Sequence, residues 1–93
     1  MKPFEYTTTH TEMVINESGN LQEFYRLANV LSNTRHVHLK SKVDDAFAVE
    51  WNYTYKGGAL TLQYNIYNGV TLVYNGKDKK YADKLAGRLR TGQ

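Results

Sequence analysis

The sequence predicts an α+β fold: a two-layer sandwich in which two helices cover one face of an antiparallel sheet of four to five strands, in the order β-α-β-β-β-β-α. Apolar residues repeat at helical spacing in two segments, near residues 20–32 and 77–90. Between these segments, apolar and polar residues alternate, as in strands with one buried face. A chain of 93 residues is long enough for one core but not for two, so we expect a single small domain over residues 1–93.

A first strand, or a hairpin, is expected where apolar residues alternate with polar ones, at Phe4, Tyr6, Met13 and Ile15. The first helix is expected over about residues 20–32, where apolar side chains lie three or four positions apart: Leu21, Phe24, Tyr25, Ala28 and Leu31. Ser18 or Asn20 can cap its exposed amides, and Asn33 is expected to end it in the left-handed conformation.

Four strands should follow. A strand with Val37 and Leu39 on one face is expected to end at the Asp44-Asp45 turn. The next three segments alternate strictly, and their apolar face is formed by Phe47, Val49, Trp51, Tyr53, Tyr55, Leu60, Leu62, Tyr64, Ile66, Val70, Leu72 and Tyr74.

The two hairpins between these strands are constrained by the requirement that the apolar face stays continuous. A two-residue loop at Asn68-Gly69 would place polar residues beside apolar ones. A three-residue loop, Tyr67-Asn68-Gly69 with Gly69 left-handed, avoids this and pairs Ile66 with Val70, Tyr64 with Leu72 and Leu62 with Tyr74. At the earlier hairpin, Lys56-Gly57 and Gly57-Gly58 preserve the faces equally well, and the pattern does not choose between them.

A second helix over about residues 77–90 is indicated by apolar residues at helical spacing, at Tyr81, Ala82, Leu85 and Leu89. The core is expected to hold Phe24, Leu31, Val49, Trp51, Leu62, Tyr64, Leu72 and Leu85.

Composition excludes several functional classes. The chain has no cysteine, so it forms no disulfide and no thiolate site, which suits a cytoplasmic location. It has no apolar run of membrane-spanning length, and we expect no membrane association. His36 and His38 could supply two ligands of a metal site, and Glu50 or His10 could complete it, but nothing in the spacing requires a third ligand. No serine lies in a nucleophile-elbow motif. Asp44-Asp45 is typical of a turn and not of a catalytic carboxylate pair. Gly57-Gly58 is typical of a hairpin loop and not of a phosphate-binding loop. We therefore expect no enzymatic activity, no cofactor, no metal and no small-molecule substrate.

Binding to another protein is the function that the sequence favours. The sheet face that the helices leave open should be flat, polar and low in charge, which suits a protein surface or a second copy of the chain. The residues expected to carry this binding are His38, Glu50, Asn52, Gln63, Asn65, Tyr67 and Asn68. The strand at Val70–Tyr74 lacks protective charge, so either another segment covers it or it accepts a partner strand. By analogy of size and class, such domains act as inhibitors, immunity proteins or adaptors, as in phage and mobile-element products.

Nucleic-acid binding is the alternative function. The net charge of +3 is uneven, because residues 77–90 hold six basic and two acidic residues. The cations that would contact phosphates are Lys79, Lys80, Lys84, Arg88 and Arg90. Most aromatic residues fall on the helix-covered face, where they cannot stack on bases. Any such binding is therefore expected to be electrostatic and weak.

Overall fold

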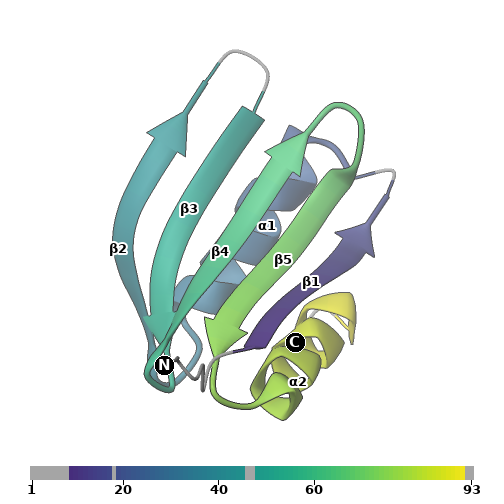
Figure 1. Ribbon diagram of the computed structural model, residues 1–93. Coiled ribbons are helices and arrows are strands. Elements are labelled where there is room, and N and C mark those ends of the chain that lie inside the picture. The colour runs from purple at the N-terminus through teal and green to yellow at the C-terminus, as the bar shows by residue number, and fades with distance from the viewer. Residues whose placement is uncertain (1–8, 18, 46–47, 92–93) are drawn as a thin grey trace, which may run out of the picture.

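The computed structural model describes residues 9–17, 19–45 and 48–91, and within them the predicted element order β-α-β-β-β-β-α is confirmed (Figure 1). The elements are β1 (Thr9–Asn16), α1 (Leu21–Ser32), β2 (Val37–Asp44), β3 (Ala48–Tyr55), β4 (Gly58–Asn65), β5 (Gly69–Gly76) and α2 (Lys79–Thr91). Phe4, Tyr6 and Phe47, which were expected in strands, lie outside the described residues.

The five strands form one antiparallel sheet in the order β1-β5-β4-β3-β2. The strand at Val70–Tyr74 is therefore not an edge, because β1 pairs with it along its length. β1 and β2 are the edges. α2 packs beside β1 and β5, and Arg90 donates a hydrogen bond of 3.0 Å from Nη2 to the carbonyl oxygen of Val14 in β1. This contact occupies a backbone acceptor of an edge strand, a common protection against pairing with other chains.

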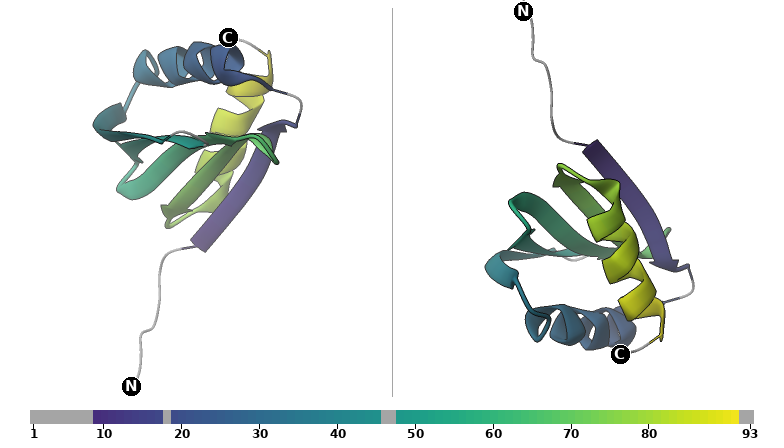
Figure 2. Two further views of the ribbon diagram at one scale, coloured as in Figure 1. Left: turned by 90° about the horizontal axis from the view of Figure 1, so that it is seen from above. Right: turned by 90° about the horizontal axis from the view of Figure 1, so that it is seen from below.

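The core is formed by alternate residues of the strands together with residues of both helices, with α1 behind the sheet in the view of Figure 1 (Figures 1 and 2). Its buried apolar residues are Phe24, Leu27, Ala28, Leu31, Val37, Val49, Tyr53, Tyr55, Leu60, Leu62, Val70, Leu72, Tyr74, Ala82, Leu85, Ala86 and Leu89. Six of the eight predicted core residues are in this cluster. Trp51 and Tyr64 are only half-buried at its margin. The ring of Trp51 packs edge-on against Phe24, and the ammonium group of Lys42 lies 4.1 Å from its centre.

The ends of α1 confirm one prediction and correct another. Asn20 is the N-cap, and its side-chain oxygen accepts from the amide of Glu23 at 2.9 Å. Asn33 is not left-handed: its φ is −101°, and its amide continues the helical pattern by donating to Asn29. The left-handed residue is His36, with a φ of 70°, where the chain reverses into β2. His36 consequently precedes the strand and does not share a strand face with His38.

The β3–β4 hairpin has a two-residue loop, Lys56-Gly57, with Tyr55 paired to Gly58. Both loop residues have positive φ, 52° and 76°, as a type I′ turn requires. The structure thus decides between the two loops that the sequence left open.

The register predicted for the β4–β5 hairpin is wrong by two residues. Asn65 pairs with Gly69, so the loop is Ile66-Tyr67-Asn68 and the following pairs are Tyr64 with Val70, Leu62 with Leu72 and Leu60 with Tyr74. Gly69 is left-handed as expected, with a φ of 70°. The chain reverses earlier than predicted because the Asn65 side chain caps the loop, and Ile66 is 59% exposed instead of lying on the apolar face.

A register shift in β2 alters which residues face the helices. Leu39 pairs with Tyr53, whereas Ser41 pairs with Asn52, so the irregularity falls at Lys40. Beyond this bulge Lys42 pairs with Trp51 on the helix side, and Val43 pairs with Glu50 on the open side. Val43 is 53% exposed there.

Candidate functional site

The tip of the β4–β5 hairpin is held by hydrogen bonds from its own first residue. The side-chain oxygen of Asn65 accepts from the amide of Tyr67 at 2.9 Å and from the amide of Asn68 at 2.7 Å. An asparagine side chain that accepts from amides two and three residues ahead replaces a backbone acceptor and fixes the turn. Asn65, predicted as a contact residue, is therefore part of the scaffold of the loop.

A second constraint comes from Gly69, where the tip leaves for β5. A Cβ added at Gly69 would lie 2.2 Å from the carbonyl oxygen of Asn16 and 2.6 Å from that of Glu17. The end of β1 therefore lies directly against the backbone of the hairpin. Because only glycine permits this approach and a φ of 70°, the position of the tip relative to the sheet is fixed by the backbone.

The fixed loop presents two large apolar side chains to solvent. Tyr67 is 85% exposed and Ile66 is 59% exposed, the two most exposed large hydrophobic residues of the described chain. Single exposed apolar residues are ordinary, but adjacent ones on a rigid projecting loop form an anchor of the kind found at the centre of protein interfaces. We call Ile66, Tyr67 and Asn68 the hairpin tip.

The open sheet face brings together several of the predicted contact residues. Glu50 pairs with Gln63 across β3 and β4, Asn52 pairs with Thr61, and His38 pairs with Thr54. His38 is exposed, whereas Glu50, Asn52, Gln63 and Asn65 are half-buried.

Asn52 is engaged within the protein. Its side-chain amide donates to Ser41 at 3.2 Å, and its side-chain oxygen accepts from Thr61 at 2.8 Å. These bonds link β2, β3 and β4 across the open face. Asn52 therefore stabilises the sheet and has limited capacity for a partner. His38, Glu50 and Gln63 are the predicted residues of this face for which no side-chain bond of this kind is described.

No group of three or more histidine and carboxylate side chains in the described residues is arranged to hold a metal ion. Nor does any helix within residues 9–17, 19–45 and 48–91 combine the length and apolarity needed to cross a membrane.

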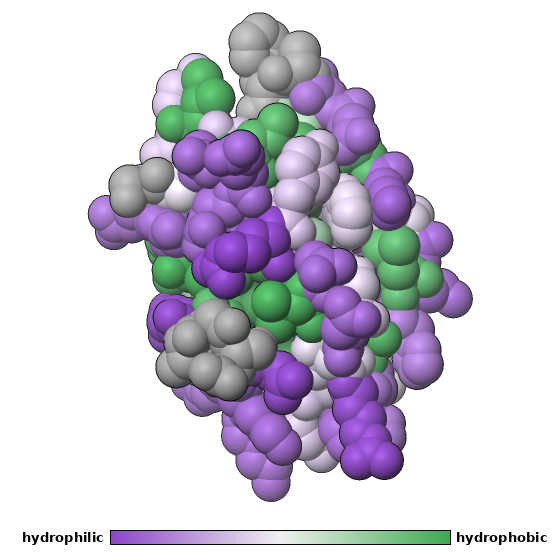
Figure 3. All heavy atoms as spheres, turned by 180° about the vertical axis from the view of Figure 1, so that it is seen from behind, coloured by the Kyte–Doolittle hydropathy of each residue, from purple (hydrophilic) through white to green (hydrophobic). Residues whose placement is uncertain are grey.

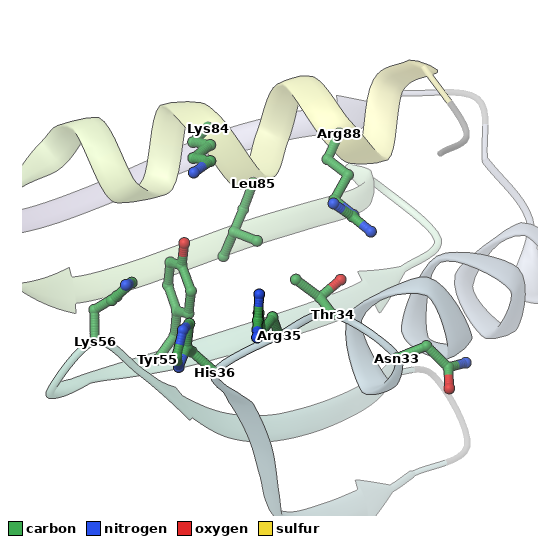
Figure 4. Close-up of a pocket in the computed structure, with 9 residues that line it drawn as sticks. All are labelled: Asn33, Thr34, Arg35, His36, Tyr55, Lys56, Lys84, Leu85 and Arg88. Atoms are coloured by element: carbon green, nitrogen blue, oxygen red, sulfur yellow. The ribbon is translucent and has the colours of Figure 1, made fainter.

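A pocket of about 570 Å³ lies at the opposite end of the sheet (Figure 4). The turn after α1, the β3–β4 hairpin and α2 form its walls. The lining residues are Asn33, Thr34, Arg35, His36, Tyr55, Lys56, Lys84, Leu85 and Arg88. Lys84 and Leu85 point from α2 toward the space above Tyr55 and Arg35, and Arg88 points toward Thr34. β4 separates this pocket from the hairpin tip, and its eight residues correspond to roughly 25 Å.

The pocket is strongly cationic. Arg35, Lys56, Lys84 and Arg88 carry positive charge, and none of the described lining residues is an aspartate or glutamate. Burial raises the pKa of Tyr55, as does nearby Tyr81, while Arg88 opposes the shift. The Tyr55 hydroxyl therefore keeps its proton at neutral pH and remains a hydrogen-bond donor.

The five cations predicted to bind nucleic acid have different neighbours in the structure. Lys79 forms an ion pair of 3.0 Å with Asp83, and Lys80 forms one of 3.6 Å with Asp78. Arg90 bonds to the backbone of β1. Only Lys84 and Arg88, four residues apart on α2, reach the pocket.

Sequence reasoning missed Arg35, Tyr55 and Lys56 as site residues, and it placed Ile66 in the apolar face. The predicted order of antiparallel strands contained a usable signal: the start of β2, the end of β3 and the start of β4 must lie at one end of the sheet. Arg35 and Lys56 flank these strand ends, so topology alone brings them close together.

On the surface of the α1 side, hydrophilic side chains surround small hydrophobic patches, and no single apolar area covers the face (Figure 3). A comparison of the chain with protein-family models gives no match, and neither does a comparison with curated protein sequences.

Proposed function

We propose that this chain is a non-enzymatic module that binds another protein and occludes or recruits it, with the hairpin tip as its anchor. The observation that carries the proposal is the 85% exposure of Tyr67 on a loop whose backbone is fixed by Asn65 and Gly69. The chain contains no cysteine, which fits a reducing compartment, and we assign this function to the cytoplasm.

The energetic reason is preorganisation. Ordering a flexible loop on binding costs free energy, and a loop that is already fixed avoids that cost. Tyrosine provides a large contact area with few rotatable bonds and a hydroxyl that can bond at the rim of a pocket. The expected partner is a protein with an apolar pocket that accepts Tyr67, with Ile66 packing beside it.

The open face contributes a second, polar contact area. Glu50 and Gln63 lie side by side in β3 and β4, and His38 lies on the same face near the start of β2. These polar side chains are expected to orient the partner more than to increase affinity, since contacts at the rim of an interface contribute little binding energy.

Site-specific photocrosslinking tests this proposal and captures the partner in the same step. A photoreactive phenylalanine derivative replaces Tyr67, and the purified protein is irradiated in an extract of the organism that encodes it. We expect a discrete protein adduct at Tyr67. The matched control carries the same group at Lys77, an exposed residue beyond the opposite end of β5.

Adducts of equal yield at Tyr67 and Lys77 would contradict the proposal, because they would reflect chance collisions. Nucleic acid as the only crosslinked species would contradict it too, and would favour the alternative function through the cations of α2.

A further inference from the structure

The function proposed for the hairpin tip gives no role to the cationic pocket at the other end of the sheet. Arg35, Lys56, Lys84 and Arg88 come from three separated segments of the chain and line one cavity. The described lining contains no aspartate or glutamate, so an anion in this cavity would face basic groups from several sides. An anion with several negative charges would be attracted by all of these groups and would accept hydrogen bonds from them.

We propose that the pocket binds the oligophosphate group of a nucleotide, either as a free nucleoside triphosphate or as the 5′-triphosphate end of an RNA strand. A volume of about 570 Å³ is within the range of small-molecule sites. The pocket lies at the other end of β4 from the hairpin tip, so this proposal stands independently of the protein-binding function.

The number of charges favours an oligophosphate over an internal nucleic-acid phosphate. A phosphodiester carries one negative charge, whereas a phosphate monoester carries about −1.5 to −2 at pH 7, and each further phosphoryl group of a chain adds to it. Four cations that line one cavity suit a compact anion with several charges. A nucleic-acid backbone would be matched instead by cations spread along a ridge.

The arrangement of α2 argues against such a ridge. Lys79 and Lys80, which would extend the cationic surface along the helix, are paired with Asp83 and Asp78. Lys84 and Arg88, about one and two helical turns beyond Lys80, are the cations of α2 that line the pocket.

The donors suit phosphate oxygens. The guanidinium groups of Arg35 and Arg88 offer parallel N–H donors that match two oxygens of one phosphoryl group. Lys56 and Lys84 act as point charges, and the Tyr55 hydroxyl, which points toward α2, adds a neutral donor (Figure 4). Leu85 forms an apolar wall that excludes water from one side.

The experiment measures binding by calorimetry and by the shift in melting temperature, at about physiological ionic strength so that nonspecific attraction is screened. The probes are inorganic tripolyphosphate, a nucleoside triphosphate, and an oligoribonucleotide with and without a 5′-triphosphate. We expect the first two probes and the triphosphorylated strand to bind and to raise the melting temperature. The strand without a terminal phosphate should bind at least about tenfold more weakly.

Paired variants separate the pocket from general charge. Lys84→Gln with Arg88→Gln removes two cations of the pocket, and we expect a loss of affinity for tripolyphosphate of about tenfold or more. Lys79→Gln with Lys80→Gln removes the same charge from the same helix, and the expected loss is about twofold or less.

Equal losses in the two double variants would overturn the proposal, as would equal binding of the two strands or no binding of tripolyphosphate at millimolar concentration. Tighter binding of the triphosphorylated strand than of the free nucleotide would assign the ligand to RNA ends, and the reverse order would assign it to free nucleotides.

Discussion

At the scale of single residues, Gly69 determines how the hairpin tip is held. Its φ of 70° and the approach of the Asn16 carbonyl both require the absence of a Cβ. Gly57 shares the first property, with a φ of 76°, but a Cβ added there would meet no atom within 4 Å. A comparison of substitutions at these two glycines therefore separates the cost of backbone strain from the cost of a steric clash.

Gly69→Ala is expected to destabilise the protein more than Gly57→Ala. The left-handed conformation costs an alanine about 1–2 kcal/mol at either position. At Gly69 the clash with the end of β1 adds a second cost, because the hairpin and β1 must move apart. Denaturant unfolding of the two variants measures the difference. Equal denaturant midpoints for the two variants would show that β1 does not hold the hairpin tip in place.

Three buried tyrosines are expected to make the protein less stable at high pH. Burial raises the pKa of Tyr53, Tyr55 and Tyr74 above the ordinary value of 10.0. Above that pH the unfolded chain has released these protons while the folded chain still holds them, so the free energy of unfolding falls as the pH increases. The contribution of these residues is complete below about pH 10 and is lost as the pH passes through the raised values.

Denaturant midpoints measured from about pH 8 to pH 11, with tyrosinate absorbance followed in parallel, test this behaviour. Part of the tyrosine absorbance should appear only when the protein unfolds. A midpoint that rises over this range would contradict the burial of these hydroxyl groups.

At the scale of elements, α1 depends on its N-cap. The Asn20 side chain satisfies the amide of Glu23, and Glu23 also forms an ion pair with Arg26 on the helix surface. Asn20→Ala should lower the free energy of unfolding by about 0.5–2 kcal/mol, because that amide loses its acceptor. Gln22→Ala, an exposed change in the first turn, should have little effect. Thermal unfolding of both variants gives the comparison.

The helices and strands could be predicted because the spacing of apolar residues along the chain indicates which side of each element is buried. The two helices and the alternating strands were recognisable, and both described helices end within two residues of their predicted bounds. The register at the β4–β5 hairpin could not be predicted from burial, since a shift of two residues leaves every side chain on the same face. The side chain of Asn65 decides it, and nothing in the alternation indicates that interaction.

The bulge at Lys40 could not be predicted from the sequence either, because burial does not constrain this part of β2. Val37 and Leu39 fit one face, and the residues after them are all exposed, so burial imposes no constraint on the rest of β2. The result is that Lys42 covers Trp51, and Trp51 lies at the margin of the core.

At the scale of the whole molecule, the sheet separates two candidate sites. The hairpin tip lies at one end of β4, and the cationic pocket lies at the other. The tip residues Tyr67 and Asn68 could be predicted from sequence because they are contiguous. The pocket is harder to predict, since three distant segments form it: the strand order brings Arg35 near Lys56, but nothing in the sequence places Lys84 and Arg88 beside them.

This separation predicts that the two sites are independent. Tyr67→Ala should leave tripolyphosphate affinity unchanged, because the tip is roughly 25 Å from the pocket, well beyond the screening length at physiological salt. Calorimetric titration of the variant measures this. A severalfold change in affinity would show coupling through the sheet.

The most direct test of the central claim is the affinity of the crosslinked protein partner for three forms of this chain: wild type, Tyr67→Ala and Tyr67→Phe. If Tyr67 is the anchor, the alanine variant should bind about tenfold more weakly or worse, while the phenylalanine variant, which keeps the ring, retains most of the affinity. Lys84→Gln should bind like the wild type. An alanine variant that is folded and binds the partner with unchanged affinity would contradict the assignment of the hairpin tip.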